Sequence, residues 1–173
     1  MRSKPRQLSS EEQVYEYAVR ALMRRAHSVY EMRQALERNA EDKTHVARVL
    51  ARLKDKGYLD DAKYARQFAR TRASGRTQGR FRIAQELRRR GVPDRHIEPA
   101  LDEVFAETDE RGLLRKRIER KLRTLRGPLD VRKRASLFAS LLRAGFSADA
   151  IRRELRLLTR DDVPENEAPD ENV

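Results

Sequence analysis

The amino-acid sequence predicts an all-α protein, built from three tandem three-helix repeats of the helix-turn-helix type that form an elongated, curved array. Two observations lead to this prediction. Apolar residues recur three or four positions apart from Glu11 to Leu158, and no stretch alternates polar and apolar residues as a strand does. The same apolar spacing also returns at shifts of 51 and then 54 residues, which is typical of a repeat protein.

The first three predicted helices each combine an apolar stripe with a start or stop signal. Ser9 and Glu12 have the spacing of a capping box before the first stripe, and Ser28 and Glu31 repeat that spacing before the second. Gly57 is expected to end the third helix. The three stripes are Val14, Ala18, Ala21 and Leu22; Met32 and Leu36; and Val46, Val49, Leu50 and Leu53.

The middle of the chain predicts three more helices. Asp60 or Asp61 can cap the fourth, and a turn flanked by Gly75 and Gly79 precedes the fifth. Pro99 lies inside the sixth stripe and removes a backbone donor, so that helix either begins late or bends. The buried faces are expected to be Ala65, Phe68 and Ala69; Ile83 and Leu87; and Ile97, Leu101 and Val104.

The last three helices complete the array. Gly127 and Pro128 are expected to end the seventh helix, because neither residue favours continuing it. The apolar stripes of the seventh, eighth and ninth helices are Leu114, Ile118, Leu122 and Leu125; Val131, Ala135, Phe138 and Leu142; and Ile151, Leu155 and Leu158.

Superposing the glycine stops brings the repeat into register. Gly91 and Gly145 take the same place in the second and third copies, whereas the first copy has Ala40 there. Apolar residues spaced by 4, 10, 4 and 3 positions recur in all three copies: Met32, Leu36, Val46, Leu50 and Leu53; Ile83, Leu87, Ile97, Leu101 and Val104; and Leu137, Leu141, Ile151, Leu155 and Leu158.

A unit of this size buries little apolar surface by itself, so neighbouring units are expected to pack on one another. The sequence therefore divides as follows: a flexible basic arm at 1–8, repeats at 9–57, 58–107 and 108–159, and a disordered acidic tail at 160–173.

The net charge of the 173 residues is +12, from 40 Lys and Arg against 28 Asp and Glu. Residues 160–173 carry −5, which leaves +17 on the rest. Residues 66–90 hold nine Arg against one acid, and residues 111–126 hold eight basic residues against one acid, so these windows carry +8 and +7. A solvated helix face usually mixes both signs, and these windows are therefore expected to meet an anionic partner.

Signs of catalysis, metal binding or cofactor binding are weak. The chain has no Cys, which excludes disulfides and thiolate chemistry, and His27, His45 and His96 have no metal-ligand spacing. Phosphate-loop and dinucleotide-binding glycine motifs are absent from the sequence. We therefore expect no enzyme activity, metal or cofactor. No apolar run exceeds three residues, so we expect a cytoplasmic, soluble protein without a membrane span or signal peptide.

Four aromatic residues lie near the first basic window. The helical spacing places Tyr58, Tyr64 and Phe68 in the core, and leaves Phe81 as the candidate for stacking on a base. No recognition helix is evident and no aromatic platform alternates with the arginines, so sequence-specific base reading is not predicted.

The central part of the chain resembles a known family. The signature of the RecX family of recombinase regulators is similar to Tyr58-Leu59-Asp60-Asp61, Tyr64-Ala65, Arg72, Gly79, Ile83, Glu86, Leu87 and Gly91-Val92. The family's first and last modules resemble Tyr17-Ala18, Leu22, Arg25, Ser28, Glu31 and Leu36, and Leu142, Gly145-Phe146 and Ile151. The resemblance covers residues 11–158, and its departures are Met32 and Asn39-Ala40 in the first module.

The resemblance implies three tandem three-helix units, no catalysis, and a monomer that binds in the groove of the RecA–DNA filament. Such a protein limits filament extension and restrains the ATPase, strand-exchange and co-protease activities of RecA in DNA repair and the SOS response. Its partners would be the RecA filament and single- and double-stranded DNA of any sequence. The residues expected to face DNA or acidic protein surfaces are Arg66, Arg70, Arg72, Arg76, Arg80, Arg82, Arg115, Arg120, Lys121 and Arg123.

Two alternatives stay open at this point: a transcription regulator built from helix-turn-helix-like units, and an adaptor that binds only protein. Charge reversal at Arg70 and Arg120 is expected to weaken filament inhibition. Contact with about six phosphates would give DNA binding a salt slope near −5. Deleting residues 160–173 is expected to tighten DNA binding at low salt, because the acidic tail competes for the same arginines.

Overall fold

The computed structural model describes residues 7–125 and 127–161, and of residues 158–161 only the backbone. The helices of this part are α1 (Glu11–Arg24), α2 (Val29–Glu37), α3 (Lys43–Asp55), α4 (Asp61–Arg70), the π-helical turn η1 (Thr71–Gly75), α5 (Arg80–Arg89), α6 (Asp94–Glu107), α7 (Glu110–Leu122), α8 (Val131–Arg143) and α9 (Ala148–Asp161).

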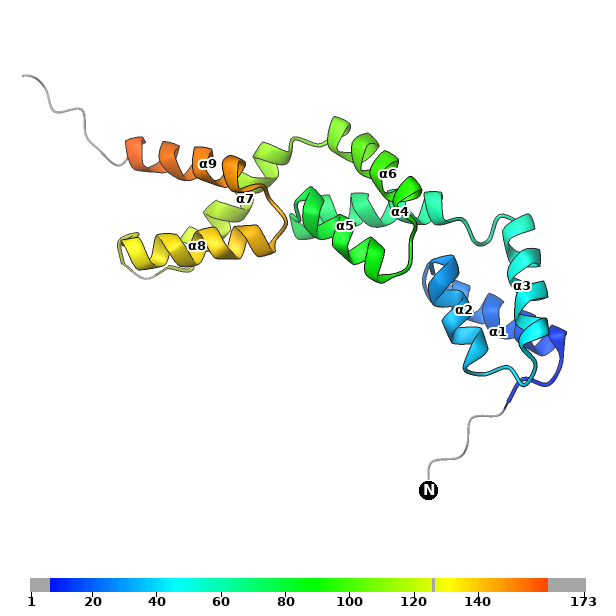
Figure 1. The fold of residues 1–173 in the computed structure, drawn as a ribbon. Helices are drawn as coiled ribbons and strands as arrows, with labels where there is room; N and C mark the ends of the chain where they lie inside the picture. Colours follow the sequence, from blue (N-terminus) through cyan, green and yellow to red (C-terminus); the bar gives the residue numbers. More distant parts are fainter. Residues whose placement is uncertain (1–6, 126, 162–173) are drawn as a thin grey trace, which may run out of the picture.

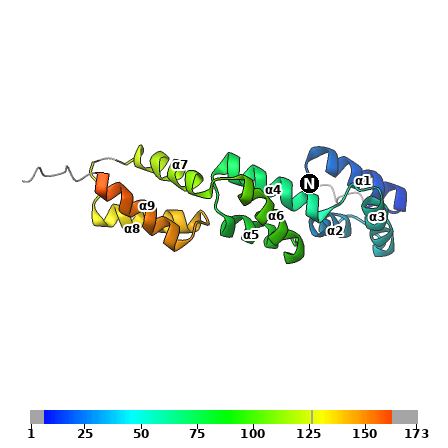
Figure 2. The same ribbon diagram turned by 90° about the horizontal axis from the view of Figure 1, so that it is seen from above.

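Three helical repeats, α1–α3, α4–α6 and α7–α9, lie one after another in an elongated row (Figure 2) that arches in Figure 1. In the described residues the only extended pairing is an isolated bridge between Leu8 and Ala40. The predicted all-α array of three-helix repeats is thereby confirmed. No helix in the described part of the chain has both the length and the apolarity that a membrane crossing requires.

Side-chain caps start several helices at the predicted positions. The Ser28 hydroxyl accepts a hydrogen bond from the Glu31 N–H at 3.0 Å, and the Glu31 carboxylate accepts one from the Ser28 N–H at 3.3 Å. This is the predicted capping box, which satisfies two of the free N–H groups at the start of α2. Asp60 caps α4 by accepting from the N–H groups of Ala62 and Lys63.

The cap of α1 differs from the prediction by one residue. Ser10, and not Ser9, is the N-cap, and its hydroxyl accepts from the Gln13 N–H at 3.3 Å. The Gln13 side chain in turn accepts from the Ser9 N–H at 3.0 Å, so Glu12 has no part in the cap. Two adjacent serines offer two registers for the cap, and the spacing alone could not separate them.

The helix around Pro99 neither begins late nor stops before the proline. α6 begins at Asp94 and continues through Pro99 to Glu107, so of the two predicted outcomes, a late start or a bend, the late start is wrong. Proline cannot donate to the carbonyl of Arg95, four residues earlier. Arg95 is exposed, so water can satisfy that carbonyl.

The face that α8 buries is also different from the first prediction. Val131 and Leu142 are exposed, with 87% and 42% of their surface accessible, whereas Leu137 and Leu141 are buried. The repeat register had placed Leu137 and Leu141 in the core, and that prediction is confirmed. α7 ends at Leu122, so the predicted stripe residue Leu125 lies beyond the helix. The side chain of Leu158 lies outside the described part.

The buried apolar residues of the described chain form two clusters. One belongs to the first repeat and includes Val14, Met32 and Leu53. The other runs without interruption through the second and third repeats, from Tyr64 to Leu155. The second and third repeats therefore share one core, and the first repeat has its own.

The first and second repeats meet where α2 begins and α5 ends. The Ser28 hydroxyl donates to the Arg90 carbonyl at 2.5 Å, and the Val29 N–H donates to the Asp61 carboxylate at 2.9 Å. Gly91 lies against the Tyr30 ring so closely that a Cβ at this position would be 2.3 Å from a ring carbon. We call this contact the first joint.

The second and third repeats meet in the same way, where α5 begins and α8 ends. The Gly79 N–H donates to the Ala144 carbonyl at 2.9 Å, and the Phe81 N–H donates to the Gly145 carbonyl at 3.2 Å. The Arg80 N–H donates to the Glu110 carboxylate at 3.3 Å, as Val29 does to Asp61 in the first joint. We call this contact the second joint. In both joints the start of the second helix of one repeat packs against the end of the second helix of the next repeat.

Candidate nucleic-acid interface

The arginines of α4 that the sequence marks as partners of an anion are paired with acids of α6. Arg70 Nη2 lies 2.8 Å from Glu103 and 3.5 Å from Glu107, and Arg66 Nε lies 3.8 Å from Glu103. All four side chains are at least partly exposed. These pairs bring negative charge from a neighbouring helix onto the surface that sequence reasoning took as purely basic.

The arginines of α5 are paired as well. Arg80 Nη2 lies 2.6 Å from Asp102 and 3.1 Å from Glu98, and the bond to Asp102 is the main cause that raises the pKa of Arg80. Arg82 Nε lies 2.9 Å from Glu86. Sequence reasoning missed Glu98 and Asp102 because they follow the window in the chain and reach it only when α6 packs against α5.

Glu86, on α5, pairs with two arginines, one from η1 and one from α5. Besides Arg82, it pairs with Arg72 at 3.2 Å and accepts from the Gln78 side chain at 3.2 Å. Burial raises the pKa of Glu86, but the hydrogen bond from Arg82 and the charge of Arg72 outweigh burial and hold that pKa below its usual range. Only 15% of the Arg72 side chain is accessible, so its charge is directed at Glu86 and not at an outside phosphate.

Arg115, on α7, is held by the buried carboxylate of Glu154. Its Nε lies 2.6 Å from Glu154, and Arg111 donates to the other oxygen of the same carboxylate. Burial raises the pKa of Glu154, yet the two guanidinium groups outweigh it and the pKa lies below its usual range. Arg115 therefore joins α7 to α9.

Arg117 was not among the candidates, although it organises the loop beside α7. Its Nη1 donates to the carbonyls of Arg76 and Thr77 at 3.0 and 3.1 Å. Arg120 Nη2 donates to the Thr77 hydroxyl at 2.9 Å. Burial, and then the charge of Arg120, lower the pKa of Arg117. Its place three residues after Leu114 on the edge of the apolar stripe was a signal that it would be half-buried.

Thr77 has a backbone φ of 48°, in the region that β-branched residues rarely adopt. The three hydrogen bonds from α7 hold this loop conformation. They also fix the backbone of Arg76 and Thr77 against α7, and the Arg76 side chain is exposed.

One group of exposed cations has no carboxylate partner. In the described chain, none of its members makes an ion pair within 4.0 Å, and Arg120 has only its bond to Thr77. Lys116, Arg120 and Arg123 follow one stripe of the helix, as expected from their spacing. We call the group the α7 basic surface, and it consists of Arg76, Lys116, Arg120, Lys121 and Arg123.

The ten predicted residues thus fall into two sets. Arg76, Arg120, Lys121 and Arg123 belong to the α7 basic surface, whose members are exposed and make no ion pair within 4.0 Å among the described residues. The others are engaged by acids of the fold: Arg66, Arg70, Arg72, Arg80, Arg82 and Arg115. The predicted net charge of the two windows was correct, but acids of the fold relieve much of it. Among the described residues of the two windows, the members of the α7 basic surface, Arg89 and the half-buried Arg117 make no ion pair within 4.0 Å.

The aromatic residues near the first window divide in a different way from the prediction. Tyr64 is buried and Phe68 is half-buried in the core, as expected, but Tyr58 is 57% exposed. The turn after Gly57 turns Tyr58 outward, and Leu59 is buried in its stead. Phe81, the candidate stacking residue, is 64% exposed on α5.

The acids that begin α4 and the histidine before α2 have structural roles. Asp60 and Asp61 bond backbone N–H groups, and the described residues contain no cluster of three potential metal ligands among His, Asp and Glu. His27 Nδ1 lies 3.0 Å from the Arg25 carbonyl; burial, followed by the charge of Arg25, lowers its pKa. The arrangement suits binding of an anion.

Comparison with known protein families gives two matches. The family model described as RecX, first three-helix domain, matches residues 15–53, and RecX, second three-helix domain, matches residues 60–101. These ranges correspond to most of α1–α3 and α4–α6.

Curated relatives match over most of their length. Regulatory protein RecX of Halorhodospira halophila is 37% identical over 155 residues, which cover 89% of this chain and 93% of the relative. Regulatory protein RecX of Chlorobaculum tepidum is 32% identical over 83% of this chain and 86% of the relative. Regulatory protein RecX of Deinococcus radiodurans is 36% identical over 86% of this chain and 72% of the relative.

Solved structures share the fold. A crystal structure of RecX from Lactobacillus salivarius superposes with a TM-score of 0.69 at 18% identity, covering 87% of this chain and 97% of that one. A second crystal structure, of regulatory protein RecX, gives a TM-score of 0.74 at 22% identity, covering 83% and 71%. The repeats, their joints and the sequence identity to curated relatives lead to one conclusion: this chain belongs to the RecX family of regulatory proteins.

Proposed function

We propose that this protein regulates RecA by binding the RecA–DNA filament, where it limits filament extension and restrains the ATPase, strand-exchange and co-protease activities. Membership of the RecX family supports a regulatory role without catalysis. The observation that carries the proposal is the α7 basic surface, because exposed cations without carboxylate partners suit the phosphates of a nucleic acid.

The ion-paired arginines have a different part in this proposal. Arg66, Arg70 and Arg80 already balance acids of α6, so they add less to the field that an approaching phosphate meets. They present mixed charge to the acidic and basic side chains of a protein partner. The α7 basic surface would thus meet DNA, and the α4–α6 surface would meet RecA.

The test uses charge reversal on the α7 basic surface. Arg70 is a poor choice, since Arg70→Glu would place a carboxylate beside Glu103 and Glu107 and disturb the packing of α4 on α6. The double variant Lys116→Glu/Lys121→Glu changes exposed residues without ion pairs among the described residues. The matched control is Lys43→Glu/Lys54→Glu, two exposed lysines of α3.

Strand exchange and single-strand-dependent ATP hydrolysis by RecA are measured with each protein added below the concentration of RecA. The wild-type protein and the control are expected to inhibit both reactions, and the α7 variant to inhibit at least tenfold less well. Equal inhibition by both double variants would remove the α7 basic surface from the proposal. No inhibition by the wild-type protein would overturn the proposal itself and favour a transcription regulator or an adaptor.

A further inference from the structure

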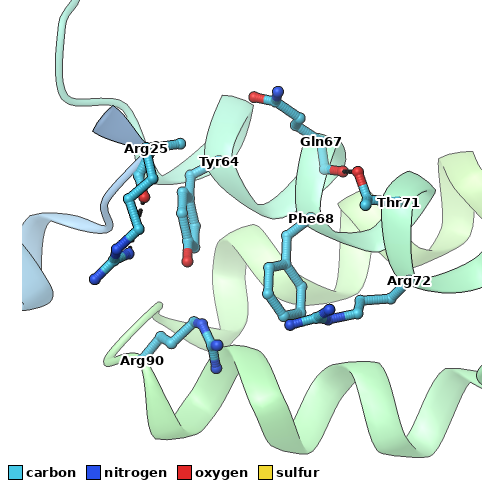
Figure 3. Close-up of a pocket in the computed structure, with 8 residues that line it drawn as sticks. Arg25, Tyr64, Gln67, Phe68, Thr71, Arg72 and Arg90 are labelled. Carbon is cyan, nitrogen blue, oxygen red and sulfur yellow. Dashed lines mark hydrogen bonds between the residues drawn. The ribbon is translucent and has the colours of Figure 1, made fainter. Parts of the chain in front are cut away.

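A cleft opens at the first joint, away from the α7 basic surface. It has a volume of about 260 Å³ and lies between the loop after α1, α4 with the η1 turn that follows it, and the end of α5. Figure 3 shows side chains from these three segments directed toward one space. Its principal walls are Arg25, Ala26, Tyr64, Phe68, Arg72 and Arg90.

The walls of this joint cleft are flat. The guanidinium groups of Arg72 and Arg90 lie 4.6 and 4.8 Å from the centroid of the Phe68 ring, and the Tyr64 and Phe68 rings lie 6.0 Å apart at an interplanar angle of 26°. Both aromatic rings and arginine planes are surfaces on which unstacked bases stack in proteins that bind single strands. The cleft therefore offers planar faces of both kinds.

The charge of the cleft is positive. Arg25 and Arg90 pair with Glu31 at 3.0 and 3.8 Å, and Arg72 pairs with Glu86. Three guanidinium groups face two carboxylates, and one of these, Glu86, also pairs with Arg82, so the cleft keeps a net positive charge. Arg25 keeps 55% of its side chain exposed, which lets it reach an anion outside the cleft without leaving its loop.

The second joint has an arginine at the position that Phe68 takes in the joint cleft. Asp61 and Glu110 make the same bond in the two joints, and this register of 49 residues places Arg117 at the position of Phe68. At the second joint the Arg117 guanidinium is held by the carbonyls of the loop before α5. At the first joint Phe68 has no donor for such a carbonyl, and the guanidinium groups of Arg72 and Arg90 lie over its ring.

The size of the joint cleft limits what it can hold. Pockets that enclose a drug-sized ligand measure about 300–1,000 Å³. At about 260 Å³ the joint cleft has room for one flat ring with a small substituent. An acidic side chain would use the arginines but leave the planar walls without a partner, whereas a nucleotide uses both.

We propose that the joint cleft binds one unstacked nucleotide of a single-stranded nucleic acid. The base lies against Tyr64 and the guanidinium faces over Phe68, and the adjoining phosphate lies at Arg25. This inference rests on the proposed function, which brings the protein to nucleic acid, and it adds a second, single-strand-specific contact to the phosphate contacts of the α7 basic surface.

Two pairs of variants test the cleft in the full-length protein. Ala26→Leu fills the mouth from an exposed loop position, and Ala47→Leu makes the same change on the exposed side of α3. Arg25→Gln removes the cation at the mouth, and Arg24→Gln removes its exposed neighbour, which has no ion pair in the described chain. Binding is measured by fluorescence anisotropy with a short oligothymidine and with a duplex of the same length.

Ala26→Leu and Arg25→Gln are expected to weaken binding of the oligothymidine, for Ala26→Leu by between about 5-fold and 150-fold, the range for losing one stacked base. Duplex binding is expected to change less than twofold, and both control variants are expected to bind like the wild-type protein. A 2-aminopurine placed in the oligothymidine should change its fluorescence on binding to the wild-type protein and not to Ala26→Leu.

Equal loss for oligothymidine and duplex would overturn the inference, because the substitution would then act through the fold. Equal affinity of Ala26→Leu and Ala47→Leu for the oligothymidine would overturn it as well. If Ala26→Leu weakens binding to DNA-free RecA and leaves the affinity for the oligothymidine unchanged, the cleft binds an acidic protein side chain. The assignment to a nucleotide would then be wrong. Failure of the wild-type protein to bind either nucleic acid would also remove the DNA contact from the proposed function.

Discussion

Glu154 shows at the scale of a single residue how this basic protein holds a buried negative charge. Its residue surface is 5% exposed, and Arg111 and Arg115 of α7 both donate to it from the neighbouring helix. A buried carboxylate is costly unless it is paired and hydrogen-bonded. The two guanidinium groups meet that condition, and they connect α7 to α9 in the third repeat.

The depressed pKa of Glu154 predicts a pH dependence of stability. A carboxylate whose pKa is lower in the folded than in the unfolded protein contributes fully above the unfolded value, near 4.5, and loses this contribution as the pH falls through the folded value. The free energy of unfolding of the wild-type protein should therefore fall more steeply below pH 4.5 than that of Glu154→Gln. Urea titrations between neutral pH and about pH 3 measure both curves.

Glu119→Gln serves as the control for this measurement. Glu119 is exposed on α7 and makes no ion pair within 4.0 Å in the described chain, so its removal should leave the slope of the wild-type curve intact. Identical pH profiles for Glu154→Gln and the wild-type protein would contradict the role assigned to Glu154.

Residue roles were predictable from the sequence only where they depend on close neighbours. The Ser28 cap and the Asp60 cap bond N–H groups within three residues, and both were predicted. The pairs of Arg70 with Glu103 and of Arg115 with Glu154 join residues 33 and 39 positions apart. Such pairs depend on how helices pack, and a count of charges inside a window cannot contain them.

The glycines of the joints act at the scale of helices. A Cβ on Gly145 would lie 2.3 Å from the backbone nitrogen of Arg82, and one on Gly79 would lie 2.4 Å from the Gly145 carbonyl oxygen. Both contacts involve backbone, which cannot move aside as a flexible side chain can. The start of α5 can therefore reach the end of α8 only when both residues lack a side chain.

This close approach predicts a difference between two glycines that both have a positive φ. Gly57 and Gly145 have φ values of +70° and +93°, but a Cβ on Gly57 would meet no atom within 4 Å. Gly57→Ala should destabilise the protein by about 1–2 kcal/mol through the left-handed backbone alone. Gly145→Ala should cost about 2–5 kcal/mol, because the clash with α5 adds to that strain.

Chemical denaturation followed by circular dichroism measures both variants, with Gly57→Ala as the control for backbone strain. Equal destabilisation would show that the second joint tolerates a methyl group. The helices themselves and their repeat register were predictable, because apolar periodicity is a local signal. The joints were not, since the glycine spacing that indicates a helix stop says nothing about which helix lies against it.

For the whole molecule, the distribution of charge matters more than its sum. The fold covers much of the basic surface of α4 and α5 with acids of α6, and leaves the five residues of the α7 basic surface unbalanced in the described chain. The sequence gives the net charge, but the packing of the helices decides which cations are paired with acids. The sequence therefore predicted that the protein meets an anion, and the structure shows which cations of the two basic windows are paired with acids and which are not.

This arrangement predicts the salt dependence of duplex binding. If each cation of the α7 basic surface meets one phosphate, the logarithm of the binding constant should fall with the logarithm of salt concentration with a slope near −4.5. Lys116→Gln/Lys121→Gln should make the slope shallower by about 1.8, and Lys43→Gln/Lys54→Gln should not change it. A wild-type slope steeper than about −7 would mean that the paired arginines also contact phosphate, contrary to this prediction.

The two hydrophobic clusters have a mechanical consequence for the molecule. The first repeat has its own core and is connected to the second by polar contacts of Ser28, Val29 and Glu31 and by the Tyr30 contact of the first joint, whereas the second and third repeats share a core. Under tension along the long axis seen in Figure 2, the first joint should part before the second. A molecule pulled from both ends would lengthen first at residues 56–60, and the second and third repeats would carry the load together until their common core ruptures.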